Sequence, residues 1–300
     1  DFKEVWAQVS AVRWSFGYVM ITTCTAYLLA TEAWRQCFPK DLPLPSLGKM
    51  FMIRQIGETL TMLTPANVIG GEASKVYMLD KYGIPSTAST SSVVISRGLI
   101  ILSYLSLGVV AGVLILLGQA QRLGVVAFLI VCAGVIVGGI VGIRALRTFI
   151  LSRDKQKSSS SWMGKFLEKA TDLLNTLFDF AAEHRRQLVV AYFLSLLHWL
   201  VGTMEFFIIL NALGIECSYV DAFLVEMGVM VFKSIGGFIP GQIGIEEYGN
   251  KVMLGMLSVA NPAIWIVVSI LRRARQLAWI LISLIFVLTF MKIKQWKFSL

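Results

Sequence analysis

Long apolar runs alternate with short polar segments along the chain. Five of the runs are at least 20 residues long, and about 20 residues let a helix cross a hydrocarbon core of about 30 Å. The runs are Val12–Ala33, Val93–Leu117, Gly124–Ile143, Leu188–Leu213 and Ala263–Met291. The pattern predicts an all-α polytopic membrane protein with about five or six transmembrane helices.

Two further apolar stretches, at about 47–82 and about 220–259, are interrupted by helix-breaking residues. Proline lacks a backbone N–H, and glycine is conformationally loose. The breaks are expected at Pro65, Gly70, Gly71, Pro240, Gly241 and Gly244. Irregular backbone at membrane depth is tolerated only inside protein or beside a wet cavity. Each stretch is therefore predicted to be a re-entrant helical hairpin, and the second half-helix of the first hairpin is expected to start near Gly71.

The two interrupted stretches resemble each other in sequence. Pro65–Leu79 and Pro240–Leu254 share four identities in fifteen positions, and the two hairpins are expected to enter from opposite faces. This combination predicts an inverted repeat whose broken helices meet near the membrane midplane.

The repeat predicts how a single transmembrane domain over 1–300 is organised. One half-repeat would cover 1–150 and the other 187–300. Between them, 151–186 would form a cytoplasmic linker and an amphipathic helix. That helix is expected to lie on the membrane surface, with packing on the protein itself as the alternative.

Residues at the ends of the spans predict the orientation. Trp34 and Arg35 close the first span and lysines follow the last one, and basic residues favour the cytoplasmic side. We therefore expect a multi-pass protein of the cell membrane (plasma or inner) with a cytoplasmic C-terminus. The N-terminus would lie outside, which leads us to expect a further span before Asp1.

Composition narrows the functional classes. Of the 300 residues, 56% are hydrophobic and only 15% are charged, against about 25% charged in soluble domains. The net charge of +9 lies mainly in basic residues between apolar spans, so we expect no nucleic-acid partner. The four cysteines show no metal or disulfide spacing. We expect free cysteines, no metal and no cofactor.

Ionisable residues inside apolar spans are costly and mark functional sites. The substrate-binding candidates are Glu72, Lys75, Arg97, Glu247, Lys251, Arg272 and Arg273. One hypothesis is that the arginines bind a lipid phosphate, because their planar forks suit it. The alternative is that they neutralise Glu72 and Glu247 in buried pairs.

The acidic candidates have alternatives too. Glu72 and Glu247 would either contact a cationic headgroup, exchange protons, or cap the half-helices. Capping is the expected role of Glu246. Glu226 and Lys233 are seven residues apart on one helical face, and an internal ion pair between them is expected.

These motifs together resemble the lysylphosphatidylglycerol synthase transmembrane family, also called flippase-like domain proteins. The resemblance covers essentially the whole chain. It is carried by Trp34-Arg35, Pro65, Gly70, Gly71, Glu72, Lys75, Arg97, Pro240, Gly241, Gly244, Glu247 and either Arg272 or Arg273. The chain departs from the family pattern at Lys75, where arginine is usual, and at Glu72, where aspartate is common. The family's first span and its fused aminoacyl-transferase domain have no counterpart in this sequence.

The resemblance implies movement of a lipid between leaflets without synthesis of that lipid. The expected function is a flippase or transporter for a phospholipid, an aminoacyl-phospholipid or a polyprenyl-phosphate-linked lipid. Membrane lipids and an anionic or lipid-linked substrate are the expected partners. No catalytic motif is found, so we expect no enzyme and no catalytic residue. Two alternatives stay open: a membrane-embedded lipid-modifying enzyme, and a non-transporting partner subunit of a lipid-synthesising enzyme.

Overall fold

The structure, a computed structural model, describes residues 12–63, 69–116, 162–236, 239–257, 259 and 261–294, and within 162–179 only the backbone. Over this part of the chain every element is helical and no strand occurs. The helices are α2 (Arg13–Arg35), α3 (Leu47–Leu63), α4 (Ile69–Asp80), α5 (Ser86–Leu116), α7 (Trp162–Ala212), α8 (Tyr219–Ile235), η1 (Pro240–Gln242), α9 (Ile245–Met256) and α10 (Pro262–Lys294). The predicted span Gly124–Ile143 lies outside the described residues.

Three of these helices are long and apolar enough to cross a membrane. The spans are Ser86–Ile115, Ala182–Ala212 and Ala263–Lys292, and they agree with three of the predicted runs. The run Val12–Ala33 forms α2, which is not among the helices that combine this length with this apolar composition. The chain is thus a helical multi-pass membrane protein.

Two pairs of shorter helices pack beside these spans. In the first pair α3 contacts α4, and in the second pair α8 contacts α9. Each pair consists of a 17-residue helix followed by a 12-residue helix. At about 1.5 Å per residue these are about 26 Å and 18 Å long, less than a hydrocarbon core of about 30 Å.

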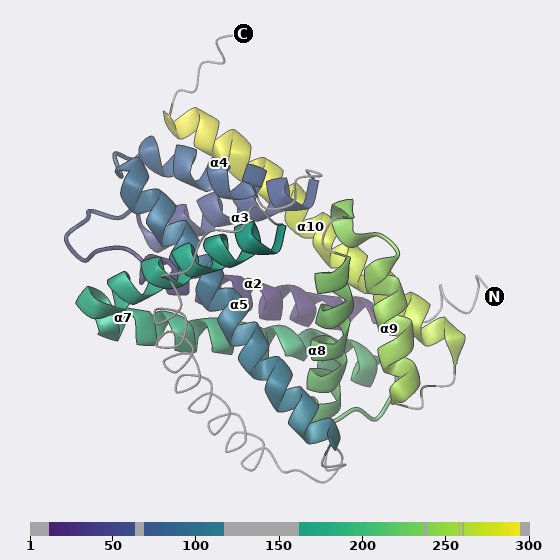
Figure 1. Cartoon of the computed structure of the whole chain (residues 1–300). Helices are drawn as coiled ribbons and strands as arrows, with labels where there is room; N and C mark the ends of the chain where they lie inside the picture. The colour runs from purple at the N-terminus through teal and green to yellow at the C-terminus, as the bar shows by residue number, and fades with distance from the viewer. Residues whose placement is uncertain are drawn as a thin grey trace.

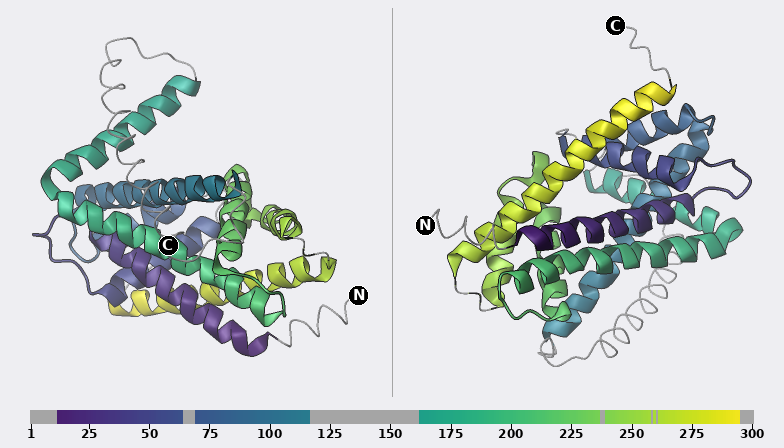
Figure 2. Two further views of the ribbon diagram at one scale, coloured as in Figure 1. Left: turned by 90° about the horizontal axis from the view of Figure 1, so that it is seen from below. Right: turned by 180° about the vertical axis from the view of Figure 1, so that it is seen from behind.

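The last helix, α10, connects the two pairs. It contacts α9 and α3, and Figure 1 shows it as a long yellow rod that runs from α9 past α3. The view from behind in Figure 2 shows α10 on the outside of the bundle, with α2 and α7 side by side next to it. The two pairs also meet directly, because α3 contacts η1.

The second pair is broken where the sequence predicts. Gly241 and Gly244 have positive φ angles of 62° and 85°, a region that glycine enters without a Cβ clash. Gln242 also has a positive φ, 52°. The chain therefore turns through the short helix η1 before α9 begins.

In the first pair, the second half-helix begins two residues before the predicted start near Gly71. Helix α4 begins at Ile69, so Gly70 and Gly71 lie inside its first turn and do not form the break. Residues 64–68, Pro65 among them, lie outside the described residues. Gly71 is needed for close packing instead, because a Cβ there would collide with the Thr61 hydroxyl and the Gly57 carbonyl on α3.

The predicted amphipathic helix is continuous with the span that follows it. α7 covers both, with a kink at His184, whose backbone is non-helical at φ −127° and ψ 38°. The kink separates a first limb, Trp162–Glu183, from the apolar limb that packs on α2 and α5. The side chains of most of the first limb lie outside the described residues, so its predicted apolar face stays a prediction.

Candidate functional site

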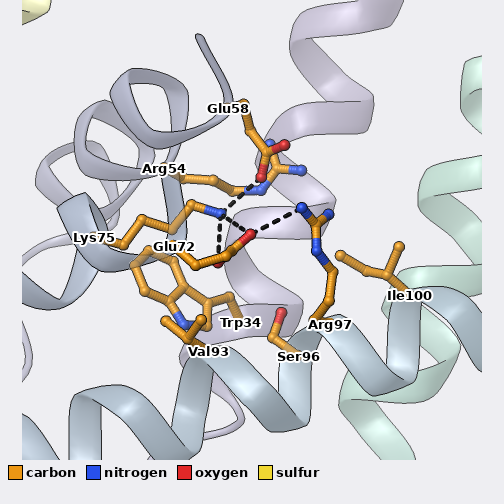
Figure 3. A pocket seen from close by; sticks show the side chains of 9 residues that line it. All are labelled: Trp34, Arg54, Glu58, Glu72, Lys75, Val93, Ser96, Arg97 and Ile100. Atoms are coloured by element: carbon orange, nitrogen blue, oxygen red, sulfur yellow. Dashed lines mark hydrogen bonds and ion pairs between the residues drawn. The ribbon is translucent and has the colours of Figure 1, made fainter. Parts of the chain in front are cut away.

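A small pocket lies where α2, α3, α4 and α5 come together. We name it the first-pair pocket; it is lined by Trp34, Arg54, Glu58, Glu72, Lys75, Val93, Ser96, Arg97 and Ile100. The space in it that a water-sized group can occupy is small, about 10 Å³, within an empty volume of about 270 Å³ that includes the open surroundings. Figure 3 shows its polar side chains converging from three helices.

Ion pairs connect the helices around this pocket. The Lys75 ammonium on α4 lies 2.8 Å from a Glu58 carboxylate oxygen on α3 and 3.1 Å from Glu72. The Arg97 guanidinium on α5 lies 2.9 Å from the other Glu72 oxygen. Figure 3 shows Glu72 between the two cations. Glu72 and Lys75 are one helical turn apart and share a face of α4.

Two glycines make room for this arrangement. A Cβ on Gly57 would collide with the aliphatic stem of Lys75, and one on Gly71 would collide with the backbone of α3. Because neither side chain is present, α4 approaches α3 closely. Lys75 then reaches Glu58 while its own side chain stays buried, at 7% exposure.

One further cation lines the first-pair pocket. Arg54 precedes Glu58 by one turn of α3, so both side chains lie on the same helical face. Arg54 is only 6% exposed and donates a hydrogen bond to the Gln55 side-chain oxygen at 3.1 Å. Its guanidinium also lies over the Tyr27 ring, 5.6 Å from the centroid.

A second cluster of charges joins α7, α8, α9 and α10. We name it the α10 network; it consists of Glu205, Glu226, Lys233, Glu246, Arg272 and Arg275. Arg272 is 2% exposed and is the centre. Its guanidinium lies 2.8 Å from both Glu226 and Glu246.

The other members complete this network. Glu205 lies 3.5 Å from Arg272 and 2.6 Å from Arg275. Lys233 lies 3.5 Å from Glu246. Arg275 also donates to the Tyr27 hydroxyl at 3.0 Å, which ties the network to α2. Three cations therefore face three carboxylates, and the α10 network is neutral.

A third feature is an open groove between α9 and α10. We name it the α9–α10 groove; its lining is mostly apolar and consists of Glu247, Trp265, Ile266, Ser269, Ile270, Arg273, Ala274 and Leu277. Its empty volume, including the space open to the surroundings, is about 920 Å³. The Glu247–Arg273 ion pair, at 2.7 Å, is its charged part, and both side chains are about one quarter exposed.

The same ion pair holds the break of the second pair. Arg273 donates to the backbone oxygens of Gly241 and Gln242 at 2.8 and 3.2 Å. Glu247 accepts from the backbone N–H of Gly244 at 2.7 Å, which satisfies a free donor at the start of α9. The pair therefore holds the loop and the half-helix in one arrangement.

The predicted binding residues fall into three places. Glu72, Lys75 and Arg97 meet in the first-pair pocket, Glu247 and Arg273 meet at the groove, and Arg272 belongs to the α10 network. Lys251 is apart from the other charges: it is exposed on α9, with its ammonium 5.8 Å from the ring centroid of Trp265, a groove residue.

One predicted ion pair and one predicted capping role are wrong. Glu226 pairs with Arg272 rather than with Lys233, because Lys233 pairs with Glu246. Glu247, not Glu246, bonds to the backbone at the start of α9. Glu246 is instead 2% exposed between Arg272 and the side-chain amide of Gln276.

All three candidate arginines contact carboxylates in this structure. Arg97 pairs with Glu72 and Arg273 with Glu247, as the alternative of neutralising pairs predicts. Arg272 is enclosed by three carboxylates, so its guanidinium is not available to a phosphate. Arg97 and Arg273 keep 29% and 25% of their side chains exposed.

Sequence reasoning missed Arg54 and Gln276. Both are polar residues within apolar helical runs, and Gln276 lies one turn after the candidates Arg272 and Arg273. The spacing Arg54-x-x-x-Glu58 was the available signal. Of the four cysteines, the three in the described residues, Cys24, Cys37 and Cys217, are free. Among those residues no group of His, Cys, Asp and Glu has an arrangement suited to a metal.

The fold and these sites define a multi-pass helical membrane protein with charged clusters between short helix pairs. Residues 1–285 match the family model described as "Lysylphosphatidylglycerol synthase TM region". The chain belongs to this family of lipid-related membrane domains. Comparisons with curated proteins and with solved structures find no match.

Proposed function

We propose that this chain is a lipid transporter that moves a phospholipid, an aminoacyl-phospholipid or a polyprenyl-phosphate-linked lipid between leaflets without changing it chemically. In this proposal the α3–α4 pair and the α8–α9 pair are re-entrant hairpins that enter from opposite faces. They form the two half-repeats of one transmembrane domain, in a cell membrane and with the C-terminus in the cytoplasm.

The dimensions of the two pairs support the repeat. Both consist of 17 and then 12 residues, and both contact α10. Contact between η1 and α3 brings the break of the second pair against the first pair. Transporters built on inverted repeats place their substrate sites where such broken helices meet.

The observation that carries the proposal is the α9–α10 groove. Its lining is mostly apolar and it is open to the surroundings, while the Glu247–Arg273 pair provides opposite charges within it. A lipid that changes leaflets needs this combination, because its chains stay in hydrocarbon while its headgroup needs polar partners. Arg273 would contact the phosphate, and Glu247 would contact a headgroup amine.

The remaining candidates take supporting roles. Lys251, close to Trp265 on the groove, would attract the headgroup to it. Glu72, Lys75 and Arg97 would provide a second polar station in the first-pair pocket. Arg272 would hold α9 against α10 without contacting the lipid.

Leaflet-specific labelling in proteoliposomes tests this function. The purified chain should accelerate the exposure of fluorescent inner-leaflet lipids to a membrane-impermeant quencher. Arg273→Gln should slow this exchange at least about tenfold, because it removes the charge that would bind the phosphate. Arg186→Gln removes the same charge from an exposed position on α7 and should leave the rate unchanged.

Two results would refute the proposal. One is exchange at the protein-free rate for every lipid class named above. The other is conversion of the headgroup, detected by mass spectrometry of the recovered lipids, which would favour the lipid-modifying enzyme. Co-purification with a lipid-synthesising enzyme and no exchange activity would favour the partner subunit.

A further inference from the structure

The charges around the first-pair pocket do not balance. Arg54, Lys75 and Arg97 face only Glu58 and Glu72. The two carboxylates are already in contact with Lys75 and Arg97. Among the residues that the structure describes, no carboxylate lies within 4.0 Å of Arg54. The pocket is therefore lined by three positive and two negative side chains, an excess of one positive charge.

The α10 network has no such imbalance of charge. There, three cations face three carboxylates, and the central arginine contacts all three of them. A buried charge without a counter-charge is strongly unfavourable. Only 6% of Arg54 is exposed. Its side-chain hydrogen bond goes to the neutral amide of Gln55. An external anion would remove the imbalance.

The donors point to the chemistry of that anion. Arg54 comes from α3, Lys75 from α4 and Arg97 from α5, so cationic N–H groups reach the pocket from three helices (Figure 3). A carboxylate offers two oxygens in one plane, whereas a tetrahedral phosphate offers oxygens in several directions. Arginine forks and a lysine ammonium both bind phosphate oxygens well.

We propose that the first-pair pocket is a binding site for a phosphate group, whose negative charge would balance the excess positive charge of Arg54, Lys75 and Arg97. The group is either the phosphodiester of a lipid headgroup or free phosphate, and the chemistry recognised is the same. This inference deepens the proposed function and rests on it for the assignment of a lipid as the source. Binding is measured without transport, so the two can fail separately.

The test titrates ligands into the full chain in an uncharged detergent and measures heat. The two probes are inorganic phosphate and a short-chain phosphatidylglycerol, and a diacylglycerol of the same chains is the phosphate-free comparison. Arg54→Met should weaken binding of the phosphate-containing probe at least about tenfold. Arg54→Lys should keep most of the affinity, and Arg186→Met is the matched loss of one charge at an exposed position.

A second variant should change the affinity for phosphate in the opposite direction. Glu58→Gln removes a carboxylate and raises the excess positive charge of the pocket, so phosphate binding should tighten severalfold. A purely structural role for Arg54 would not produce this gain. It also keeps the proposal testable if Arg54→Met does not fold, which thermal unfolding reports.

The results of these titrations distinguish a lipid phosphodiester from free phosphate. Binding of phosphatidylglycerol that inorganic phosphate displaces supports a lipid phosphodiester, and binding of inorganic phosphate alone supports free phosphate. Equal affinities in the unsubstituted chain and Arg54→Met overturn the inference, as does equal binding of diacylglycerol. Phosphate binding without lipid exchange would leave this site standing and refute the transport function.

Discussion

The neighbouring arginines of α10 should respond very differently to the same substitution. Arg272 is 2% exposed and lies 2.8 Å from both Glu226 and Glu246. Arg272→Met keeps a similar length but leaves three buried carboxylates facing two cations. Removing one partner of a buried ion pair costs about 3–5 kcal/mol. The free energy of unfolding should fall by that amount.

Arg273 is the matched comparison, one residue later on the same helix. Its ion pair with Glu247 is about one quarter exposed, and such pairs contribute about 0–1 kcal/mol. Its hydrogen bonds to Gly241 and Gln242 add to this, since bonds to charged groups contribute about 1.5–3 kcal/mol in buried settings and less when exposed. Arg273→Met should therefore lower the unfolding free energy by about 1–2 kcal/mol.

Titration of the micellar protein with a denaturing detergent, followed by circular dichroism, measures both changes. Pairing Arg272→Met with Glu246→Gln restores the balance of charge in the α10 network. The double variant should therefore be more stable than Arg272→Met alone. Equal losses for Arg272→Met and Arg273→Met, or a loss below about 1 kcal/mol for Arg272→Met, would contradict the importance of charge balance.

Local packing leads to two further predictions, one for a substitution and one for a chemical modification. Gly71→Ala should destabilise the first pair by about 1–3 kcal/mol, because the added Cβ would collide with Thr61 and with the Gly57 carbonyl. In the same unfolding assay Gly48→Ala, with open space around it, should be neutral or slightly stabilising. Equal effects of the two substitutions would refute this account. Burial raises the pKa of the Cys217 thiol to about 11, so at pH 8 almost none of it is thiolate and alkylation should be slow. Peptide mass spectrometry should show little labelling of Cys217 in the folded chain and full labelling after denaturation, and rapid labelling of the folded chain at pH 8 would count against its burial.

The helices were predictable because long apolar runs have few alternatives in a membrane protein. The runs that became α5, α10 and the second limb of α7 were recognised, although α5 begins at Ser86 rather than at the predicted Val93. The break at Gly241 and Gly244 was also predictable, since both residues adopt the positive φ angles that glycine allows. The close packing at Gly71 was not predicted, because a glycine needed for close helix packing and one needed for a turn look the same in sequence.

The pairing of charges was less predictable. Helical spacing shows which residues share a face, but it does not show which neighbouring helix covers that face. Glu226 and Lys233 do share a face of α8, yet Glu226 contacts Arg272 of α10 and Lys233 contacts Glu246 of α9. Arg54 was overlooked because its own helix is mostly apolar. Its importance comes from α4 and α5, which complete the pocket around it.

The two helix pairs are attached to α10 by different chemistry. The second pair is held through Arg272 and its buried carboxylates. The first pair is held through hydroxyl contacts, with Thr59 donating to Ser283 at 2.8 Å and Ser283 donating to the Gln55 carbonyl at 3.2 Å, and through apolar packing. Separating buried charges is more costly than exchanging hydroxyl partners or sliding apolar surfaces.

We therefore expect the first pair to move more readily than the second. Arg54 belongs to this less firmly attached pair. An anion that contacts Arg54, Lys75 and Arg97 would join α3, α4 and α5 through one group, in addition to the ion pairs already present. Occupancy of the pocket and the position of the first pair would then be linked, because a ligand shifts an equilibrium toward the arrangement that it binds more tightly.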